Sequence, residues 1–405
     1  MTKTLLVISG GAEAVPGIKR AKAMGYYVVV SDYNPQAPGF AFADDHLIAS
    51  TYDAEETIAV ASEYHQNIRP IGGVICMAAD VPLTVAKVAH SLGLPSLSIE
   101  TATLASDKLA MKQCFVEQGI AIPWFSQVMS AQHLREIVAD RGRSLIIKPV
   151  DSRGSRGVLQ LSGVQDLHWA FQHAKSQSPS KRVMVEQFEA GPQVSTESIM
   201  VNGEAVTPGF IDRNYQYLEK FSPFIIENGG HQPSTLNPAQ CQQVTALAEQ
   251  AARAMGINNG IAKGDMVLTA VGPKVIEIAA RLSGGWMSSD QIPTATGVDI
   301  VGAAIKLALG EAVDVNDYQP TQHKGMAIRY FFPEPGVLKS IKNIEQVESL
   351  DWVYRLGFFA SPGDKVGAVT DHTQRAGYVI TLADDCAQAV ARAQQVVDTL
   401  VFELD

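Results

Sequence analysis

Residues 148–158 read Lys-Pro-Val-Asp-Ser-Arg-Gly-Ser-Arg-Gly-Val and follow an apolar run, 145–147, that predicts a short buried strand. Glycines let the backbone turn its N–H groups toward an anion, and Lys148 with the two arginines adds positive charge. This combination suits a triphosphate. Because the lysine precedes the glycines, the stretch is not a Walker loop. Taken alone, it is also typical of an ordinary glycine–serine turn.

A second stretch places charged side chains in an apolar strand. Residues 275–285 read Val-Ile-Glu-Ile-Ala-Ala-Arg-Leu-Ser-Gly-Gly. Period-two alternation predicts that Glu277, Ala279 and Arg281 share one face. Because an unpaired acid on a buried face is costly, Glu277 should have a cation as its partner, either Arg281 or a metal ion.

A further carboxylate precedes this strand. Asp265 is separated from Glu277 by Gly272-Pro273, a turn signal that predicts a hairpin bringing the two acids together. Paired carboxylates suit Mg2+, a hard cation that takes oxygen ligands and bridges phosphates. A purely structural ion pair between Glu277 and Arg281 is the alternative.

Composition and charge exclude several classes of protein. The chain has 405 residues, of which 46% are hydrophobic, and a formal net charge of −10 without a basic stripe, which argues against nucleic acid as a partner. No stretch reaches the ~20 apolar residues of a membrane helix, and the N-terminal apolar run is too short for a signal peptide. The four cysteines lack metal or redox spacing, so we expect reduced thiols in a cytoplasmic protein with no membrane partner.

The first part of the chain alternates strands and helices. We expect strands over 4–9, 26–31 and 73–76 and helices over 12–24 and 81–92, which predicts a parallel sheet covered on both faces. Gly10-Gly11 followed by Asp32 is similar to a dinucleotide-binding pattern, but Gly-x-Gly-x-x-Gly is absent.

Taken together and in order, the motifs resemble the ATP-grasp superfamily, in the branch that holds carboxylate–amine ligases, L-amino acid ligases and biotin-carboxylase-like enzymes. The motifs are Ser106-Asp107-Lys108, the Lys148 loop, the Val-Glu-Gln-Phe run at 185–188, Asp265 and the run 277–285. The resemblance spans nearly the whole chain. Many relatives carry Asn at the position of Ala279, although those in the amino acid ligase branch can also read Glu-Ile-Ala-Ala-Arg.

The resemblance implies an α/β and α+β architecture, an ATP-grasp fold in four parts. These are an N-terminal Rossmann-like domain (1–101), a small subdomain with the glycine loop (102–188), a large subdomain with the metal site (189–312) and an α+β closing domain (313–405). In the closing domain we expect four antiparallel strands and a long helix over 384–400, with no chemical motif.

Residues 212–237 form the longest expected irregular stretch. A long loop inside a compact domain is usually functional or disordered, and its aromatic side chains argue against disorder. We interpret it as a substrate-facing loop with His231 as its polar contact; a structural histidine is the alternative.

The resemblance also assigns roles to residues, with ATP and Mg2+ (or Mn2+) as cofactors. Those implied for the nucleotide are Lys108, Lys148, Ser152, Gly154, Ser155, Gly157, Glu186, Gln187, Phe188 and Gln193, the last where relatives have a ribose-binding acid. Those implied for the metal are Asp265 and Glu277. Those implied for the substrate are Arg281, Ser283, Gly284 and Gly285, with Arg281 and Lys148 catalytic.

The implied reaction is phosphorylation of a carboxylate by ATP and attack of an amine on the acyl phosphate, releasing ADP and phosphate. The expected partners are small-molecule carboxylate and amine substrates, such as amino acids, and a second copy of the chain in a homodimer. One alternative is phosphorylation of formate or bicarbonate, as in purine-biosynthetic and biotin-carboxylase relatives. Another is a nucleotide-binding regulatory protein, which the intact Lys148, Asp265, Glu277 and Arg281 disfavour.

Overall fold

The N-terminal parallel sheet is built around the first strand of the chain. The computed structural model describes residues 2–405, and its first sheet has the order β3-β2-β1-β4, all parallel. Its strands are β1 (Thr4–Ile8), β2 (Tyr27–Asp32), β3 (Asp45–Ile48) and β4 (Gly73–Ile75). The flanking helices are α1 (Val15–Ala23), α2 (Ala54–Asn67) and α3 (Pro82–Ser91). Alternate side chains of β1 enter two different apolar cores, one with α1 and one with α2 and α3, so the predicted two-sided cover is confirmed.

A smaller antiparallel sheet carries the glycine loop. Its strand order is β5-β8-β6-β7, with two helices packed against it. The strands are β5 (Phe125–Val128), β6 (Leu145–Pro149), β7 (Leu159–Gln160) and β8 (Val183–Gln187), and the helices are α6 (Ala131–Arg141) and α7 (Leu167–Ser176). The glycine loop follows the fully buried strand β6, as predicted.

Two helices, α4 (Ile99–Ser106) and α5 (Lys108–Glu117), precede this sheet. Helix α5 begins at Lys108. Asp107 is the cap, because its carboxylate accepts the N–H groups of Leu109 and Ala110, while Ser106 is the last residue of α4.

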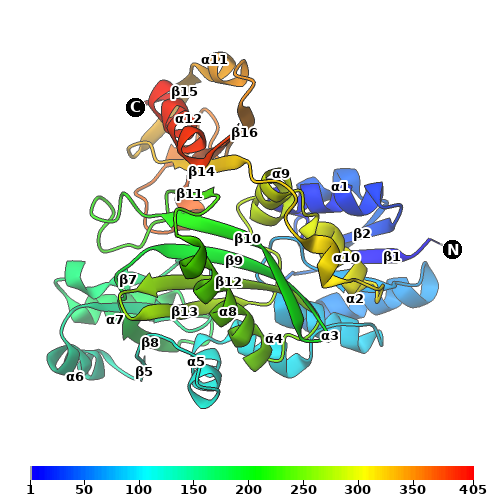
Figure 1. The fold of residues 1–405 in the computed structure, drawn as a ribbon, viewed down its shortest axis with the longest axis horizontal. Coiled ribbons are helices and arrows are strands. Elements are labelled where there is room, and N and C mark those ends of the chain that lie inside the picture. The colour runs from blue at the N-terminus through cyan, green and yellow to red at the C-terminus, as the bar shows by residue number, and fades with distance from the viewer. Residues whose placement is uncertain (1) are drawn as a thin grey trace.

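An eight-stranded sheet joins the middle of the chain to its C-terminal part, as Figure 1 shows in green through red. Its order is β13-β12-β9-β10-β11-β14-β18-β16. In chain order the strands are β9 (Gln193–Val201), β10 (Glu204–Asn214), β11 (Gly229–Gln232), β12 (Gly260–Thr269), β13 (Gly272–Ala279), β14 (Gly325–Phe331), β16 (Val353–Phe358) and β18 (Gly377–Ala383). Strand β11 lies inside the stretch 212–237 that we expected to be irregular. It pairs with β10 and β14, and so the sheet continues across the boundary that we expected at residue 312.

The remaining elements cover this sheet or extend its C-terminal end. The helices are α8 (Pro238–Ala254), α9 (Ile292–Thr296), α10 (Ile300–Ala308), α11 (Ile344–Glu348) and α12 (Cys386–Thr399), with a π-helix at Met287–Gln291. A three-stranded sheet holds β15 (Gly336–Lys342), β17 (Lys365–Val366) and β19 (Val401–Leu404). Short 3-10 turns occur at Ala12–Ala14, Pro38–Phe42, Leu161–Gly163, Val315–Tyr318 and His372–Gln374. Within residues 2–405 no helix has the length and apolar character needed to cross a bilayer, and all four cysteines are free.

Candidate active site

A cavity of about 700 Å³ lies where the sheets meet. The N-terminal domain contributes Glu13 and Asp80, the glycine loop contributes most of 152–158, and the large sheet contributes the β12–β13 hairpin. The C-terminal part also lines it, through residues including Tyr330, His372 and Arg375. We expected no chemical motif in residues 313–405, yet side chains of this segment line the cavity. Their side chains reach the cavity because β11 and β14 pair in one continuous sheet.

All but two of the predicted site residues line this cavity. The predicted residues that line it are Lys108, Lys148, Ser152, Gly154, Ser155, Glu186, Gln187, Phe188, Gln193, Asp265, Glu277, Arg281, Ser283, Gly284 and Gly285. Gly157 is not among the lining residues. It turns the loop with a φ of +76°, and a Cβ there would lie 2.8 Å from Pro149 Cγ.

His231 faces away from the cavity. Its Nε2 lies 3.4 Å from Asp212 Oδ2, and Asp212 stands between Ile211 and Arg213, which do line the cavity. Since side chains alternate across a sheet, Asp212 and His231 belong to the opposite face. The predicted contact of His231 with a substrate therefore gains no support from this geometry.

Two lysines share one buried carboxylate beneath the glycine loop. Lys148 Nζ lies 2.5 Å from Glu186 Oε1, and Lys112 Nζ on α5 lies 3.0 Å from Glu186 Oε2. Burial alone would raise the pKa of Glu186, but the charges of Lys112 and Lys148 lower it to about 2. Burial lowers the pKa of Lys112 to about 8. Lys112 was missed from the sequence, because a lysine inside an ordinary helix gives no sign that it is 1% exposed.

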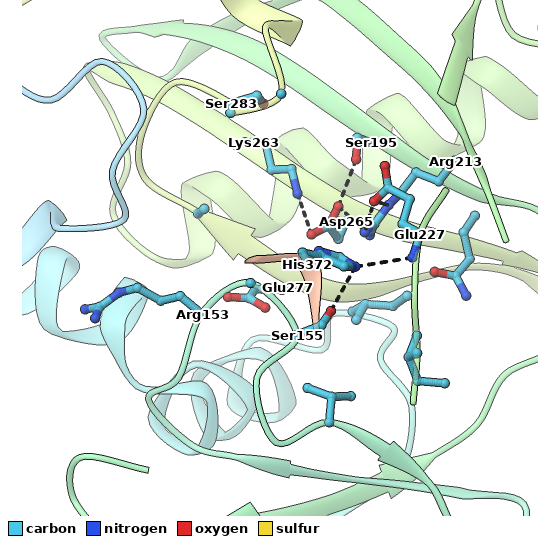
Figure 2. A pocket seen from close by; sticks show the side chains of 18 of the residues that line it. Arg153, Ser155, Ser195, Arg213, Glu227, Lys263, Asp265, Glu277, Ser283 and His372 are labelled. Atoms are coloured by element: carbon cyan, nitrogen blue, oxygen red, sulfur yellow. Dashed lines mark hydrogen bonds and ion pairs between the residues drawn. The ribbon is translucent and has the colours of Figure 1, made fainter. Parts of the chain in front are cut away.

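The hairpin brings the two predicted metal acids together. Asp265 on β12 is the direct cross-strand partner of Glu277 on β13, as predicted. Asp265 Oδ1 accepts a hydrogen bond from Ser195 Oγ at 2.9 Å and lies 3.0 Å from Arg213 Nη1, and Lys263 pairs with the other oxygen (Figure 2). Although burial opposes it, the charges of Arg213 and Lys263 hold the pKa of Asp265 well below its usual range.

These two carboxylates are compatible with a Mg2+ ion. Both face the cavity, and carboxylate oxygen is the donor that Mg2+ takes from a protein when phosphates and water fill its other positions. In residues 2–405 no cluster of three or more His, Cys, Asp or Glu side chains is arranged to hold a metal by itself. The donor set thus fits an ion shared with a phosphate ligand rather than an ion held by protein groups alone.

Arg281 and Glu277 do not form the ion pair that we considered. Strand β13 ends at Ala279, so Arg281 has left the strand, and its Nε donates to Asp80 Oδ1 at 3.1 Å. Glu277 Oε1 instead lies 3.3 Å from Lys108 Nζ. Asp80, from the N-terminal part of the chain, thus orients Arg281. The sequence did not reveal this contact.

The turn after Arg281 is fixed by two carboxylates. Ser283 N–H donates to Glu197 Oε1 at 2.9 Å, and Gly285 N–H donates to Glu13 Oε2 at 2.7 Å. A Cβ on Gly284 would lie 2.8 Å from that same Glu13 oxygen, which explains the glycine. Ser283 Oγ is buried and has no hydrogen-bond partner within the described residues. The turn can therefore offer Ser283 Oγ to a ligand, whereas two of its backbone N–H groups are already used.

The glycine loop is held by contacts from both the N-terminal and the C-terminal part of the chain. Arg153 lies 3.8 Å from Asp80 and stacks over the Tyr52 ring at 4.8 Å, both in the N-terminal domain. On the other side His372 N–H donates to Gly154 O at 3.1 Å, and its Nε2 lies 3.3 Å from Ser155 Oγ (Figure 2). The same nitrogen accepts the backbone N–H of residue 227 at 3.2 Å, and burial keeps the pKa of His372 well below its usual value. A neutral imidazole is consistent with this acceptor role.

Comparison with known proteins identifies the fold. Residues 105–285 match the profile of the ATP-grasp domain, and residues 329–405 match that of the L-amino acid ligase C-terminal domain 2. The chain belongs to the ATP-grasp superfamily. Within it, the chain falls in the carboxylate–amine ligase family, whose members are ATP-dependent, ADP-forming C–N ligases.

Several relatives span most of this ATP-grasp chain. An uncharacterized protein, y4rH, of Sinorhizobium fredii is 25% identical over 423 residues, which cover 100% of this chain and 84% of the relative. A D-alanine--D-alanine ligase of Cupriavidus metallidurans is 27% identical over 251 residues, covering 59% of this chain and 74% of that ligase. The crystal structure of an L-amino acid ligase from Bacillus licheniformis superposes with a TM-score of 0.84 at 20% identity, covering 100% of this chain and 99% of that one.

Proposed function

We propose that this ATP-grasp enzyme joins a carboxylate to an amine through an acyl phosphate, forming an amide or peptide bond from amino acids or another small carboxylate. The observation that carries the proposal is the convergence of three groups on one cavity. These are the lysines beside the glycine loop, the cross-strand carboxylates Asp265 and Glu277, and Arg281. Phosphoryl transfer needs mainly positioning and charge neutralisation, which such groups supply.

The nucleotide would occupy the side of the cavity next to the small sheet. Lys108 and Lys148 would neutralise its phosphates, and loop residues Ser152, Gly154 and Ser155 would cover them, with Gly157 allowing the loop to turn. The backbone from Glu186 through Gln187 to Phe188 would hydrogen-bond the adenine, and Gln193 would lie near the ribose. The side chain of Glu186 would act on the nucleotide indirectly, because it orients the phosphate-binding Lys148.

The metal ion would lie between Asp265 and Glu277. Either Mg2+ or Mn2+ suits two carboxylates, and when bound the ion supplies neutralisation of phosphate charge. The cations near these acids, Lys108, Lys263 and Arg213, balance their charge in the ligand-free protein.

The carboxylate to be phosphorylated would meet the nucleotide beside Arg281. Its guanidinium can make the two-point contact that carboxylates and phosphates favour, and Asp80 fixes its direction. Ser283, with its unpartnered hydroxyl, and the Gly284-Gly285 turn would complete the substrate side. We also propose that the N-terminal domain mediates a homodimer, which light scattering of the purified protein would test.

The decisive experiment combines product analysis with trapping. Purified protein is incubated with ATP, Mg2+ and pairs of carboxylates and amines, with release of ADP and phosphate followed and the amide identified by mass spectrometry. Hydroxylamine in place of the amine should yield a hydroxamate together with ADP. Lys148→Ala should abolish these products. Formation of AMP instead of ADP would refute the acyl phosphate, and turnover with formate or bicarbonate alone would favour the alternative chemistry.

A further inference from the structure

The acids that line the active-site cavity are almost all neutralised by neighbouring cations. Those with a lysine or arginine nitrogen within 4.0 Å are Asp80, Glu186, Glu189, Glu227, Asp265 and Glu277. Among the described cavity residues Glu13 is the exception, since it has no such cation. Burial raises its pKa, opposed by the N–H of Gly285 and by the charges of Arg375 and Arg281. Glu13 is therefore the described cavity acid that has no lysine or arginine in direct contact.

Two cations of the same cavity likewise lack an acid partner. Those paired with an acid are Lys108, Lys148, Arg153, Arg213, Lys263 and Arg281. Within residues 2–405, Arg156 and Arg375 have no acid within that distance. Arg156 belongs to the glycine loop, where its Nε donates to Arg153 O at 3.0 Å. Arg375 belongs to the C-terminal part and lies outside the nucleotide motifs.

Arg375 is held in place without being neutralised. Its guanidinium carbon lies 3.5 Å above the centre of the Tyr330 ring, and its Nη2 donates to Glu227 O at 2.8 Å. Its Nε is buried and has no partner in the described part of the chain. Stacking and one backbone contact fix the direction of this guanidinium but leave N–H donors free for an anion.

Arg375 and Glu13 meet at one corner of the cavity. A Cβ on Gly285 would lie 2.8 Å from Tyr330 Oη, and the N–H of Gly285 donates to Glu13. The turn thus joins Glu13 on one side to the Tyr330–Arg375 stack on the other. One acid and one cation, each without an ion-pair partner, in such a corner match the two charged groups of an α-amino acid zwitterion.

We propose that Arg375 binds the α-carboxylate of an amino acid that serves as the amine substrate. The inference rests on the ligase function proposed above. The carboxylate of the acyl donor is consumed by phosphorylation, whereas an amino acid acceptor keeps its own carboxylate and needs a partner for it. Arg281 is already assigned to the acyl donor and is ion-paired with Asp80, whereas Arg375 has no acid partner and its Nε has no hydrogen-bond partner within the described residues.

The test compares amine substrates that differ only in whether they carry the α-carboxylate. Turnover at saturating ATP is measured with the standard L-amino acids and with their carboxamides, and the acid-over-amide ratio of kcat/KM is taken for each. Arg375→Met should lower that ratio about 10- to 100-fold, the scale of a charged hydrogen bond, while the KM for ATP changes little. Arg375→Lys should recover part of the ratio, because it restores charge without the planar fork.

Arg156→Met is the matched control, since it removes the other acid-free cation of the cavity. It should raise the KM for ATP and leave the acid-over-amide ratio as in the parent. An unchanged ratio in correctly folded Arg375→Met, checked by its melting temperature, would overturn the inference. So would an effect confined to the KM for ATP, which would make Arg375 a nucleotide ligand.

A calorimetric titration separates this inference from the ligase proposal. The parent and Arg375→Met are titrated with amino acids and carboxamides in the presence of ADP and Mg2+. If the parent makes no amide from any pair, the ligase proposal fails, but a preference for the free acid that disappears in Arg375→Met would still support the carboxylate site. Equal binding of acid and amide by the parent would refute that site.

Discussion

The buried carboxylate of Glu186 offers a sharp test of how the lysines of the site are held. Glu186→Gln preserves shape but leaves Lys112, which is 1% exposed, without its counter-charge. Lys148 is 4% exposed but lines the cavity, whereas Lys112 does not line it. Removing one partner of a buried ion pair costs about 3–5 kcal/mol, because an uncompensated charge remains, and we expect a loss of that size near neutral pH.

The loss of stability in Glu186→Gln should depend on pH in a defined direction. In the parent, the pKa of Lys112 is about 8, already below the ~10.4 of an unfolded lysine, and losing Glu186 lowers it further. Between the folded and unfolded pKa values the unfolded state binds more protons, so stability rises with pH. The penalty of Glu186→Gln should therefore shrink as pH rises toward about 8, by about 1.4 kcal/mol for each unit by which the pKa of Lys112 falls.

The assay is urea unfolding followed by tryptophan fluorescence at about pH 6 and about pH 9, for the parent and Glu186→Gln. The double variant Lys112→Met/Glu186→Gln is the control. It should recover much of the stability and lose the extra pH dependence of Lys112, because only Lys148, which borders the cavity, then lacks its counter-charge. A penalty below about 1 kcal/mol, the scale of an exposed ion pair, or a penalty equal at both pH values would refute the reasoning.

Three further outcomes are expected. Glu277→Gln should remove Mg2+-dependent turnover while calorimetry still detects nucleotide binding; equal losses of stability and activity would instead indicate a structural ion pair with Lys108. Arg281→Lys should bind ATP nearly as well as the parent but lose turnover by about 10²-fold, the scale of one charge-stabilising donor, and a raised KM for ATP with unchanged kcat would make it a nucleotide ligand. His372→Ala should increase hydrogen exchange in the glycine loop of the ligand-free protein, since its ring contacts Ser155; protection equal to the parent would argue against the ring as a latch.

Features that depend on neighbouring residues in the sequence were predictable. The alternation of β13, with the turn at Gly272-Pro273, predicted that Asp265 and Glu277 lie opposite each other, and the register confirms it. The apolar run before Lys148 predicted a buried strand, and β6 is fully buried. Strand periodicity and turn residues act over a few positions, so the printed sequence already contains this information.

Contacts between distant segments were not predictable in the same way. The sequence suggested Glu277 as the partner of Arg281, because they are four positions apart, but Asp80 takes that place from 201 positions away. Lys112 reads as an ordinary helix lysine, and Arg375 lies in a segment without a motif.

The sequence by itself therefore determined the main local elements, such as β6 and the β12–β13 hairpin, the loop chemistry and the superfamily resemblance. Only the tertiary structure decided which charges neutralise each other and which remain free for a ligand. The physical reason is that the interaction of two charges depends on their separation and burial in space, which no local pattern encodes.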